Sequence, residues 1–227
     1  MKYYLKLNTI LIIPILLVMS SCIDHHHHHE TEDCIRGVGE IVTETRTLTE
    51  FDGISAGVVG NVFLLEGTNH EIRIESNANI IPAINTQVSN NMLLIDLDEC
   101  IKHTDRLDFY VTTPSIRTLT FSGVGNVSTL HEINFDDLNV TMSGVGNLTL
   151  LGSAKRLDCV LSGIGDVDAF DLLSEDAEVR LSGIGNMRIS ADNTLDATLS
   201  GTGDILYKGN ATVTATVTGT GNVRKVD

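Results

Sequence analysis

Tryptophan is absent from this chain of 227 residues, phenylalanine and tyrosine together number ten, and proline occurs three times. With so few rings available, any core must be aliphatic. Basic residues are also scarce, because 15 Lys and Arg stand against 30 Asp and Glu and give a formal charge of −15 at pH 7. A protein that binds nucleic acid by neutralising phosphates needs the opposite balance, so we exclude that function.

What the chain does contain is 42% apolar residues and 20 glycines, with many Val, Ile, Thr and Leu. This composition is typical of β-strands separated by glycine turns, in an all-β fold. The length fits one domain or at most two.

Residues 1–21 have the features of a secretory leader. Lys2 and Lys6 precede an apolar run, Leu7–Met19, that is shorter than the roughly 20 residues of a membrane-spanning helix and ends in small residues. The last leader residues and Cys22 resemble a bacterial lipobox, in which the cysteine is diacylated and becomes the mature N-terminus. We therefore expect a lipid anchor at Cys22 that holds the protein on a membrane of the cell envelope. The alternative is ordinary cleavage, which would leave Cys22 as a plain thiol.

Residues 22–33 are polar and acidic around a run of histidines, and we predict a flexible tether. Neutral imidazoles bind transition metals, but a flexible run lacks the fixed geometry and supporting contacts of a dedicated site. We expect a spacer and no cofactor, with weak metal candidates at His25, His26, His27, His28 and His29.

The rest of the chain is a repeat. The five-residue phrase Ser/Thr-Gly-x-Gly-Asn/Asp occurs six times, at spacings of 21, 19, 20, 18 and 18 residues. A period near 20 indicates a solenoid in which each repeat is one coil. A looser copy, with one extra residue, lies at 56–61. The six copies begin at Ser122, Ser143, Ser162, Ser182, Ser200 and Thr218.

Before each phrase, apolar and polar residues alternate, as in Leu138, Val140 and Met142 with Asn139 and Thr141 between them. This period of two predicts a strand with one buried face. An apolar residue follows each phrase, so each coil is predicted to consist of a strand, a glycine bend and a second strand. We therefore predict a parallel β-helix with coils of about 18–21 residues, regular from about residue 118.

Two glycines recur in every phrase. Either the chain bends there with a positive φ, which we favour, or opposite walls approach too closely for a side chain. The polar residue that follows would stack on its counterpart one coil away, at about 4.8 Å, and cap turn backbone groups. This predicts a structural ladder of Asn126, Asn147, Asp166, Asn186, Asp204 and Asn222.

The N-terminal half, Ile35–Pro114, has less regular copies of the same pattern. Strands are expected at 62–65, 72–74, 93–97 and 107–111, with a short helical turn within 79–86. No linker separates this half from the repeats. We predict a single domain over 34–227 whose N-terminal half caps the solenoid.

The repeated phrase, behind a lipoprotein leader and a Cys34-x-x-Gly37-x-Gly39 opening, resembles the GIN-domain family of autotransporter-adhesin head proteins. The resemblance covers roughly Cys34 to Asp227. It implies a right-handed β-helix at a bacterial cell surface or in the periplasm, and it brings no catalytic residues to transfer.

Three cysteines follow Cys22. In an exported protein we expect Cys34 and Cys100 to form a disulfide that ties the first ordered residues to the end of a strand. Cys159 occupies an inward position and is interpreted as a buried thiol. Cys100 and His103, with the aspartates around them, imitate a metal site only weakly.

Calcium and catalysis are the remaining alternatives. Calcium-binding β-rolls repeat every nine residues and keep Asp, whereas four of the six phrases here end in Asn. Asp166 and Asp204 are two coils apart, near the upper limit for a glycosidase pair, and no basic residue accompanies them in the phrase. We therefore predict no enzyme. We expect an adhesin-like surface module for a glycan or protein, or else an envelope scaffold without a ligand.

Overall fold

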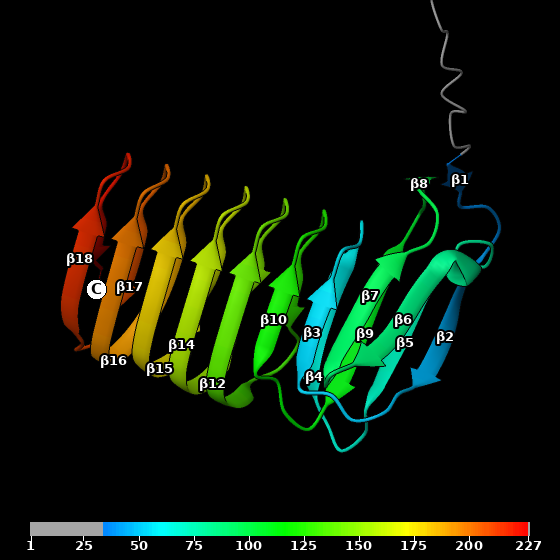
Figure 1. Ribbon diagram of the computed structural model, residues 1–227, viewed down its shortest axis with the longest axis horizontal. Coiled ribbons are helices and arrows are strands. Elements are labelled where there is room, and N and C mark those ends of the chain that lie inside the picture. The colour runs from blue at the N-terminus through cyan, green and yellow to red at the C-terminus, as the bar shows by residue number, and fades with distance from the viewer. Residues whose placement is uncertain (1–33, 227) are drawn as a thin grey trace, which may run out of the picture. The chain divides into compact units, whose positions relative to one another are not determined.

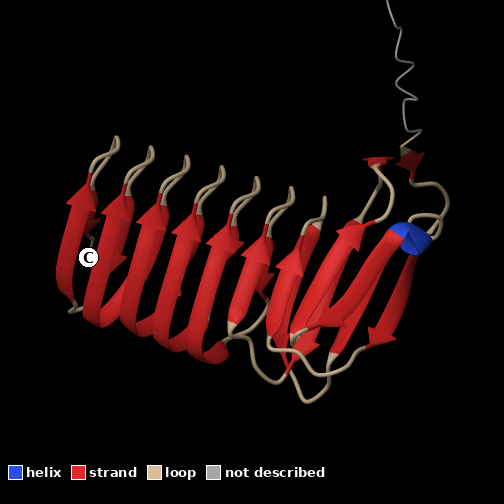
Figure 2. Cartoon of the chain, viewed as in Figure 1, coloured by secondary structure: helices blue, strands red, loops and turns tan. Residues whose placement is uncertain are grey.

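The computed structural model describes residues 34–226, and this range is almost entirely strand and turn. Within it the helical structure is limited to η1, a 3-10 turn at Ile81–Ala83, which lies inside the short helical segment expected from the sequence. Seventeen strands form one hydrogen-bonded sheet that coils into a solenoid, shown in Figures 1 and 2. The predicted all-β solenoid is confirmed.

The first wall of the solenoid is a continuous parallel ladder, because each strand pairs in register with the strand one coil away. In stacking order its strands are β7 (Met92–Leu97), β3 (Gly53–Ala56), β10 (Thr118–Phe121), β12 (Ile133–Met142), β14 (Gly152–Leu161), β15 (Val167–Leu181), β16 (Met187–Leu199) and β18 (Thr212–Val217).

The second wall is also parallel, and β15 and β16 are long enough to take part in both walls. Its other strands, in stacking order, are β9 (Leu107–Thr113), β4 (Asn61–Glu66), β11 (Val127–Thr129), β13 (Leu148–Thr149), β17 (Ile205–Lys208) and β19 (Val223–Lys225).

The alternation read from the sequence places the core correctly. Leu138, Val140 and Met142 are at most 2% exposed, and Leu138 stacks in register on Leu157 of the next coil. Apolar residues at the same positions, Cys159 among them, repeat this pattern up to β16, so the core is a set of mainly aliphatic ladders between the walls. In β18, the last strand of the first wall, the corresponding residues are not fully buried.

The N-terminal half departs from the expectation of irregular coils. Strands β2 (Ile41–Thr47), β5 (Glu71–Asn77) and β6 (Ile84–Ser89) pair antiparallel to their neighbours, so they do not copy the parallel coil. A short parallel pair, β1 (Ile35–Arg36) with β8 (Ile101–His103), lies outside the main sheet. These strands cover the first coil, as a cap must.

The coils also do not follow the order of the chain. The coil formed by β3 and β4 pairs on one side with β10 and β11, and on the other side with β7 and β9. The earliest coil in the sequence therefore lies second in the stack. Its glycine bend is the looser phrase at 56–61, which falls in line with the six regular copies through a bridge between Val59 and Val124.

Candidate functional site

The six phrases and the looser copy form a row of tips along one edge of the solenoid, where the first wall turns into the second. Figure 2 shows them as parallel tan loops above the strand ends. Each tip between the two ends of the row is bonded to the tips of both neighbouring coils. Gly125 N–H donates to Val145 O, and Val145 N–H donates to Gly123 O, both at 2.9 Å. The tips therefore form a third parallel ladder and not a set of independent loops.

The two glycines of each phrase meet two different requirements. The second glycine has φ between +137° and +149°, a region that essentially only glycine occupies. In addition, a Cβ at either position would collide with the previous coil, at 2.0 Å from Gly123 O for Gly144 and at 1.6 Å from Gly125 O for Gly146. The bend favoured from the sequence is present, and the close approach is to the adjacent coil, not to the opposite wall.

The residue between the two glycines points into solvent. Val124, Val145 and Ile184 are 51%, 47% and 56% exposed, and each bridges the corresponding residue of the next coil. The result is a narrow apolar strip along the row of tips, which we call the tip ridge. It consists of Val59, Val124, Val145, Ile164 and Ile184, and continues as Thr202 and Thr220.

A ladder of polar side chains borders the tip ridge on the side of the second wall. Asn147 Oδ1 accepts the backbone N–H of Asp166 at 2.9 Å, and Asp166 Oδ1 accepts that of Asn186 at 2.7 Å. The same bond joins the other predicted members, from Asn126 to Asn222. These side chains each hold the turn of the next coil.

Two members of this ladder were missed by the sequence analysis. Asn61 Oδ1 accepts the N–H of Asn126 at 3.2 Å, and Asn61 Nδ2 donates to Asp108 Oδ1 at 2.9 Å. Each of them precedes a buried apolar residue, Val62 and Phe109, as Asn126 precedes Val127. That local pattern was the available signal.

On the other side, the tip ridge is bordered by exposed hydroxyls from the first residue of each phrase. These are Ser122, Ser143, Ser162, Ser182, Ser200 and Thr218. An apolar strip with a polar rim on both sides is the composition of an interaction surface. Chemically it offers van der Waals contact with hydrogen bonds at its margins.

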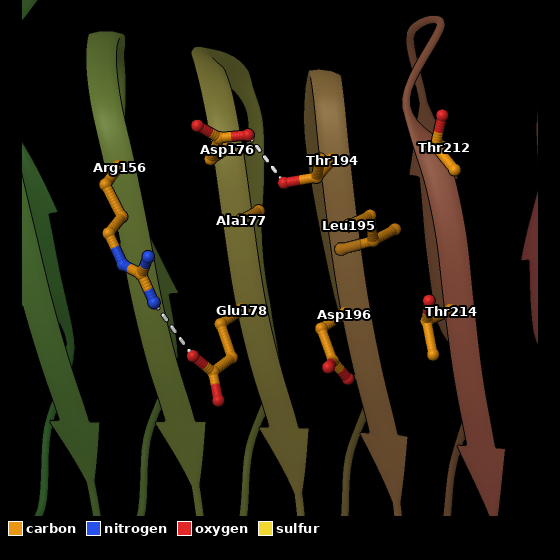
Figure 3. A pocket seen from close by; sticks show the side chains of 9 residues that line it. All are labelled: Arg156, Asp176, Ala177, Glu178, Thr194, Leu195, Asp196, Thr212 and Thr214. Carbon is orange, nitrogen blue, oxygen red and sulfur yellow. Dashed lines mark hydrogen bonds and ion pairs between the residues drawn. The ribbon is translucent and has the colours of Figure 1, made fainter.

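A shallow hollow of about 330 Å³ lies on the first wall, over β14, β15, β16 and β18 (Figure 3). Its carboxylates are partly engaged, because Arg156 Nη2 donates to Glu178 at 2.9 Å and Thr194 Oγ1 donates to Asp176 at 2.5 Å. Asp196 lies beside them. Within residues 34–226, no three His, Cys, Asp or Glu side chains converge as metal ligands. The hollow is open to solvent and adds acidic character to this wall.

On strands of the same wall, Lys155 Nζ of β14 lies 2.7 Å from Asp136 Oδ1 of β12. The hydrogen bond from Lys155, and then its charge, hold the pKa of the Asp136 carboxyl below its usual range. Both side chains are largely exposed, so the pair contributes little to stability.

The three cysteines within residues 34–226 occupy two environments. Cys34 and Cys100 form a disulfide with a Cα–Cα distance of 4.8 Å, which links the segment before β1 to the loop between β7 and β8. Cys100 is therefore not a thiolate ligand beside His103, whose own neighbour is Asp105 at 3.6 Å. Cys159 is buried, and burial raises the pKa of its thiol to about 12.

Two aromatic clusters on the outer face of the second wall were also missed by the sequence analysis. Phe63 and Tyr110 stack with centroids 4.8 Å apart, with the Arg73 guanidinium 3.6 Å from the Tyr110 ring. Further along, Arg188 covers Phe170 at 4.3 Å. Tyr110 and Phe170 each have a cation over the ring, and Phe63 stacks on Tyr110, so these clusters stabilise the wall by stacking and cation–π attraction.

Two predicted features lie outside the described residues, namely the lipid anchor at Cys22 and the histidine run 25–29. Among residues 34–226 there is also no helix with the length and apolarity of a membrane span.

Comparison with known proteins gives a consistent picture. Residues 50–211 match the family described as "Putative auto-transporter adhesin, head GIN domain". A "putative adhesin" from Bacteroides fragilis has a similar structure, with a TM-score of 0.73 and 25% identity over 85% of this chain and 100% of that one. A "putative adhesin" from Parabacteroides distasonis shares the fold, with a TM-score of 0.52 and 19% identity over 86% and 100%. No curated protein shows significant similarity to this chain.

Proposed function

Since this chain belongs to the GIN-domain family, described as the head of an autotransporter adhesin, we propose that it is a lipid-anchored, non-catalytic adhesion module of the cell envelope. In this proposal the acyl chains on Cys22 hold the protein on the membrane, the acidic segment 22–33 spaces it from the lipid, and the solenoid presents the tip ridge to a partner.

The observation that carries this proposal is the exposed tip ridge. In five successive coils a Val or Ile side chain is about half exposed at the tip. These side chains therefore contribute less hydrophobic stabilisation than they would in the core. Thr202 and Thr220 occupy the same position in the last two coils, so the backbone tolerates a polar residue there. The apolar character is therefore not needed by the turn itself, and an external contact explains it.

The polar ladders on both sides indicate the kind of partner. Hydroxyls and amides offer hydrogen bonds to a neutral, hydroxyl-rich or peptide-like surface, whereas the charge of −15 opposes binding to anionic polymers. We propose a neutral surface glycan or a protein as the ligand class.

The test is binding of a soluble form that starts at Ile23 to a glycan array and to intact bacterial and epithelial cells. The double variant Ile164→Thr, Ile184→Thr removes two of the five apolar residues of the tip ridge, both of its isoleucines, and copies the threonine that two other coils already have there. We expect it to fold like the wild type and to lose at least about tenfold in affinity.

The matched control is Leu173→Thr, because Leu173 is 58% exposed but lies away from the tips. It removes a similar exposed apolar side chain and should leave binding unchanged. Equal loss in both variants would contradict a specific role of the tip ridge. Absence of binding to any glycan or cell by the wild type would favour the alternative function, an envelope scaffold without a ligand.

A further inference from the structure

The ring stack on the outer face of the second wall has one covered end and one open end. Tyr110 of β9 and Phe63 of β4 lie in register, and their rings stack with centroids 4.8 Å apart and planes 23° apart. Arg73 of β5 pairs on the other side of Tyr110, and its guanidinium lies 3.6 Å from the ring centroid. Toward the next coil, the residue in register with Phe63 is Ser128 of β11. One face of the Phe63 ring is therefore stacked, and the other face is directed over a serine.

Several polar groups beside this open ring face have no partner within the described protein. Ser128 and Thr149 lie in register on β11 and β13, and both point outward because the residues on either side of each are buried. Within residues 34–226, neither hydroxyl forms a hydrogen bond. Asn147 Oδ1 accepts the N–H of Asp166, but Asn147 Nδ2 donates to no described residue. Two hydroxyls and an amide are thus available to an external ligand.

The platform is held in a fixed orientation by its covered end. Glu75 accepts hydrogen bonds from the guanidinium groups of both Arg73 and Arg106, the second at 2.8 Å, and its side chain is only 16% exposed. This network keeps Arg73 against Tyr110, and Tyr110 in turn supports Phe63. A ring that is already ordered loses little conformational entropy when a ligand binds to it.

The surroundings of the open ring face are those of a site for an uncharged, amphipathic ligand. The residue that follows Thr149 in the row is Asp168, and its charge is paired with Arg188 at 2.7 Å. Leu130, two residues after Ser128, is 39% exposed and adds apolar contact at the margin. A sugar ring has an apolar C–H face that packs on an aromatic face, and hydroxyls at its rim that bond to neighbouring hydroxyls and amides.

We propose that the open face of Phe63 binds one pyranose ring of a neutral glycan, at a second site on this chain besides the tip ridge. The C–H face of the sugar stacks on the ring, and its hydroxyls bond to Ser128, Thr149 and Asn147. Successive coils are about 4.8 Å apart, close to the length of one sugar in an extended chain, so the glycan would continue along the solenoid axis over Thr149. This site depends on the ring stack and not on the tip ridge.

The test is affinity electrophoresis of the soluble form that starts at Ile23. Each gel contains one neutral polysaccharide, namely hydroxyethyl cellulose, galactomannan, xyloglucan or amylopectin. We expect at least one of them to retard the protein, equally at low and high salt because no charge takes part. Ser128→Tyr extends the stack against the open face of Phe63, so its ring occupies the position of the sugar. This variant should melt no lower than the wild type and should bind at least about tenfold more weakly.

Two substitutions of the ring separate stacking from apolar character alone. Phe63→Tyr keeps the flat face and should bind like the wild type. Phe63→Leu keeps much of the apolar volume without a flat face and should bind at least about tenfold more weakly. The matched control for the added ring is Thr141→Tyr, at an exposed position of β12 on the first wall, which should leave binding unchanged.

The double variant Ile164→Thr, Ile184→Thr distinguishes this site from the tip ridge. A polysaccharide that is bound at the ring stack should retard this double variant as it retards the wild type. Loss of binding in the double variant, together with wild-type binding by Ser128→Tyr, would assign the glycan to the tip ridge and overturn the proposal. Absence of binding to all four polysaccharides, or loss of binding at high salt, would also overturn it. The same holds if Ser128→Tyr impairs only an attachment to cells that protease treatment of those cells abolishes, because the partner would then be a protein.

Discussion

At the scale of single residues, the second glycine of the phrase is the position that the fold can least replace. Gly185 has φ +148°, and a Cβ there would lie 1.7 Å from Gly165 O. Gly185→Ala must therefore strain the backbone and push two coils apart, and we expect a loss of about 3 kcal/mol or more in the free energy of unfolding. Chemical denaturation monitored by circular dichroism measures this.

The control at the neighbouring residue is Ile184→Thr, which should cost less than about 0.5 kcal/mol because the side chain is solvent-exposed. If EDTA or added Ca²⁺ changed the difference between the two variants, the glycine would serve a bound cation and the backbone explanation would be wrong.

Cys159 gives a second prediction at this scale. Burial raises its pKa to about 12, so in the folded protein the thiol stays protonated and unreactive at pH 8 to 9. A thiol reagent should label it only after denaturation. The unfolded thiol ionises near pH 8.5 and the folded one near 12, so this group should lower stability as pH rises through that interval. Native labelling at pH 8 as fast as in denaturant would contradict its burial.

At the scale of strands, the inward ladders carry the stability. Leu181 is fully buried on β15, and Leu181→Asp would place an unpaired carboxylate among aliphatic side chains, at a cost of several kcal/mol. Arg180→Asp, one residue away on the outer face, loses the ion pairs with Asp158 and Glu178 and adds a carboxylate beside them. Because the site is open to solvent, we expect a cost of about 2 kcal/mol or less, well below that of Leu181→Asp. Thermal melts of both variants test the assignment of the two faces, and the reverse ranking would refute it.

The same strands explain how far the sequence could predict the fold. In strand segments such as Leu138–Met142, apolar and polar residues alternate, and the same alternation recurs in every coil. Both the strand and its buried face could therefore be predicted directly. The pairing of β2 with β5, about 30 residues apart, leaves no local signal, because antiparallel and parallel strands share one alternation. The polar ladder was predicted from its repeating phrase, whereas Asp108 was missed because it stands outside any phrase.

At the scale of the whole molecule, the prediction concerns the lipid anchor. If Cys22 is acylated, metabolic labelling with a fatty-acid analogue should mark the wild-type protein, and the protein should fractionate with membranes. Cys22→Ala should abolish the label and release the protein from the membrane fraction, while the solenoid, which starts later in the chain, should melt unchanged. Labelling of the variant at wild-type level would contradict acylation at this residue.

The displaced position of the β3–β4 coil has a consequence for how the chain reaches its fold. As the chain is synthesised from its N-terminus, residues 53–66 appear before either neighbouring coil exists. Their partners come much later in the sequence, since Gly53 pairs with Met92 of β7 and Asn61 pairs with Asp108 of β9, and β10 comes later still. The first cooperative unit must therefore close these long loops before it gains any stability, which is the slow kind of step. Every later coil then needs only the preceding 18 to 21 residues as its template.

Folding should therefore consist of slow nucleation at the capped end followed by rapid growth of the later coils. Deleting the last coil should change the folding rate little, and reducing the Cys34–Cys100 disulfide should slow folding.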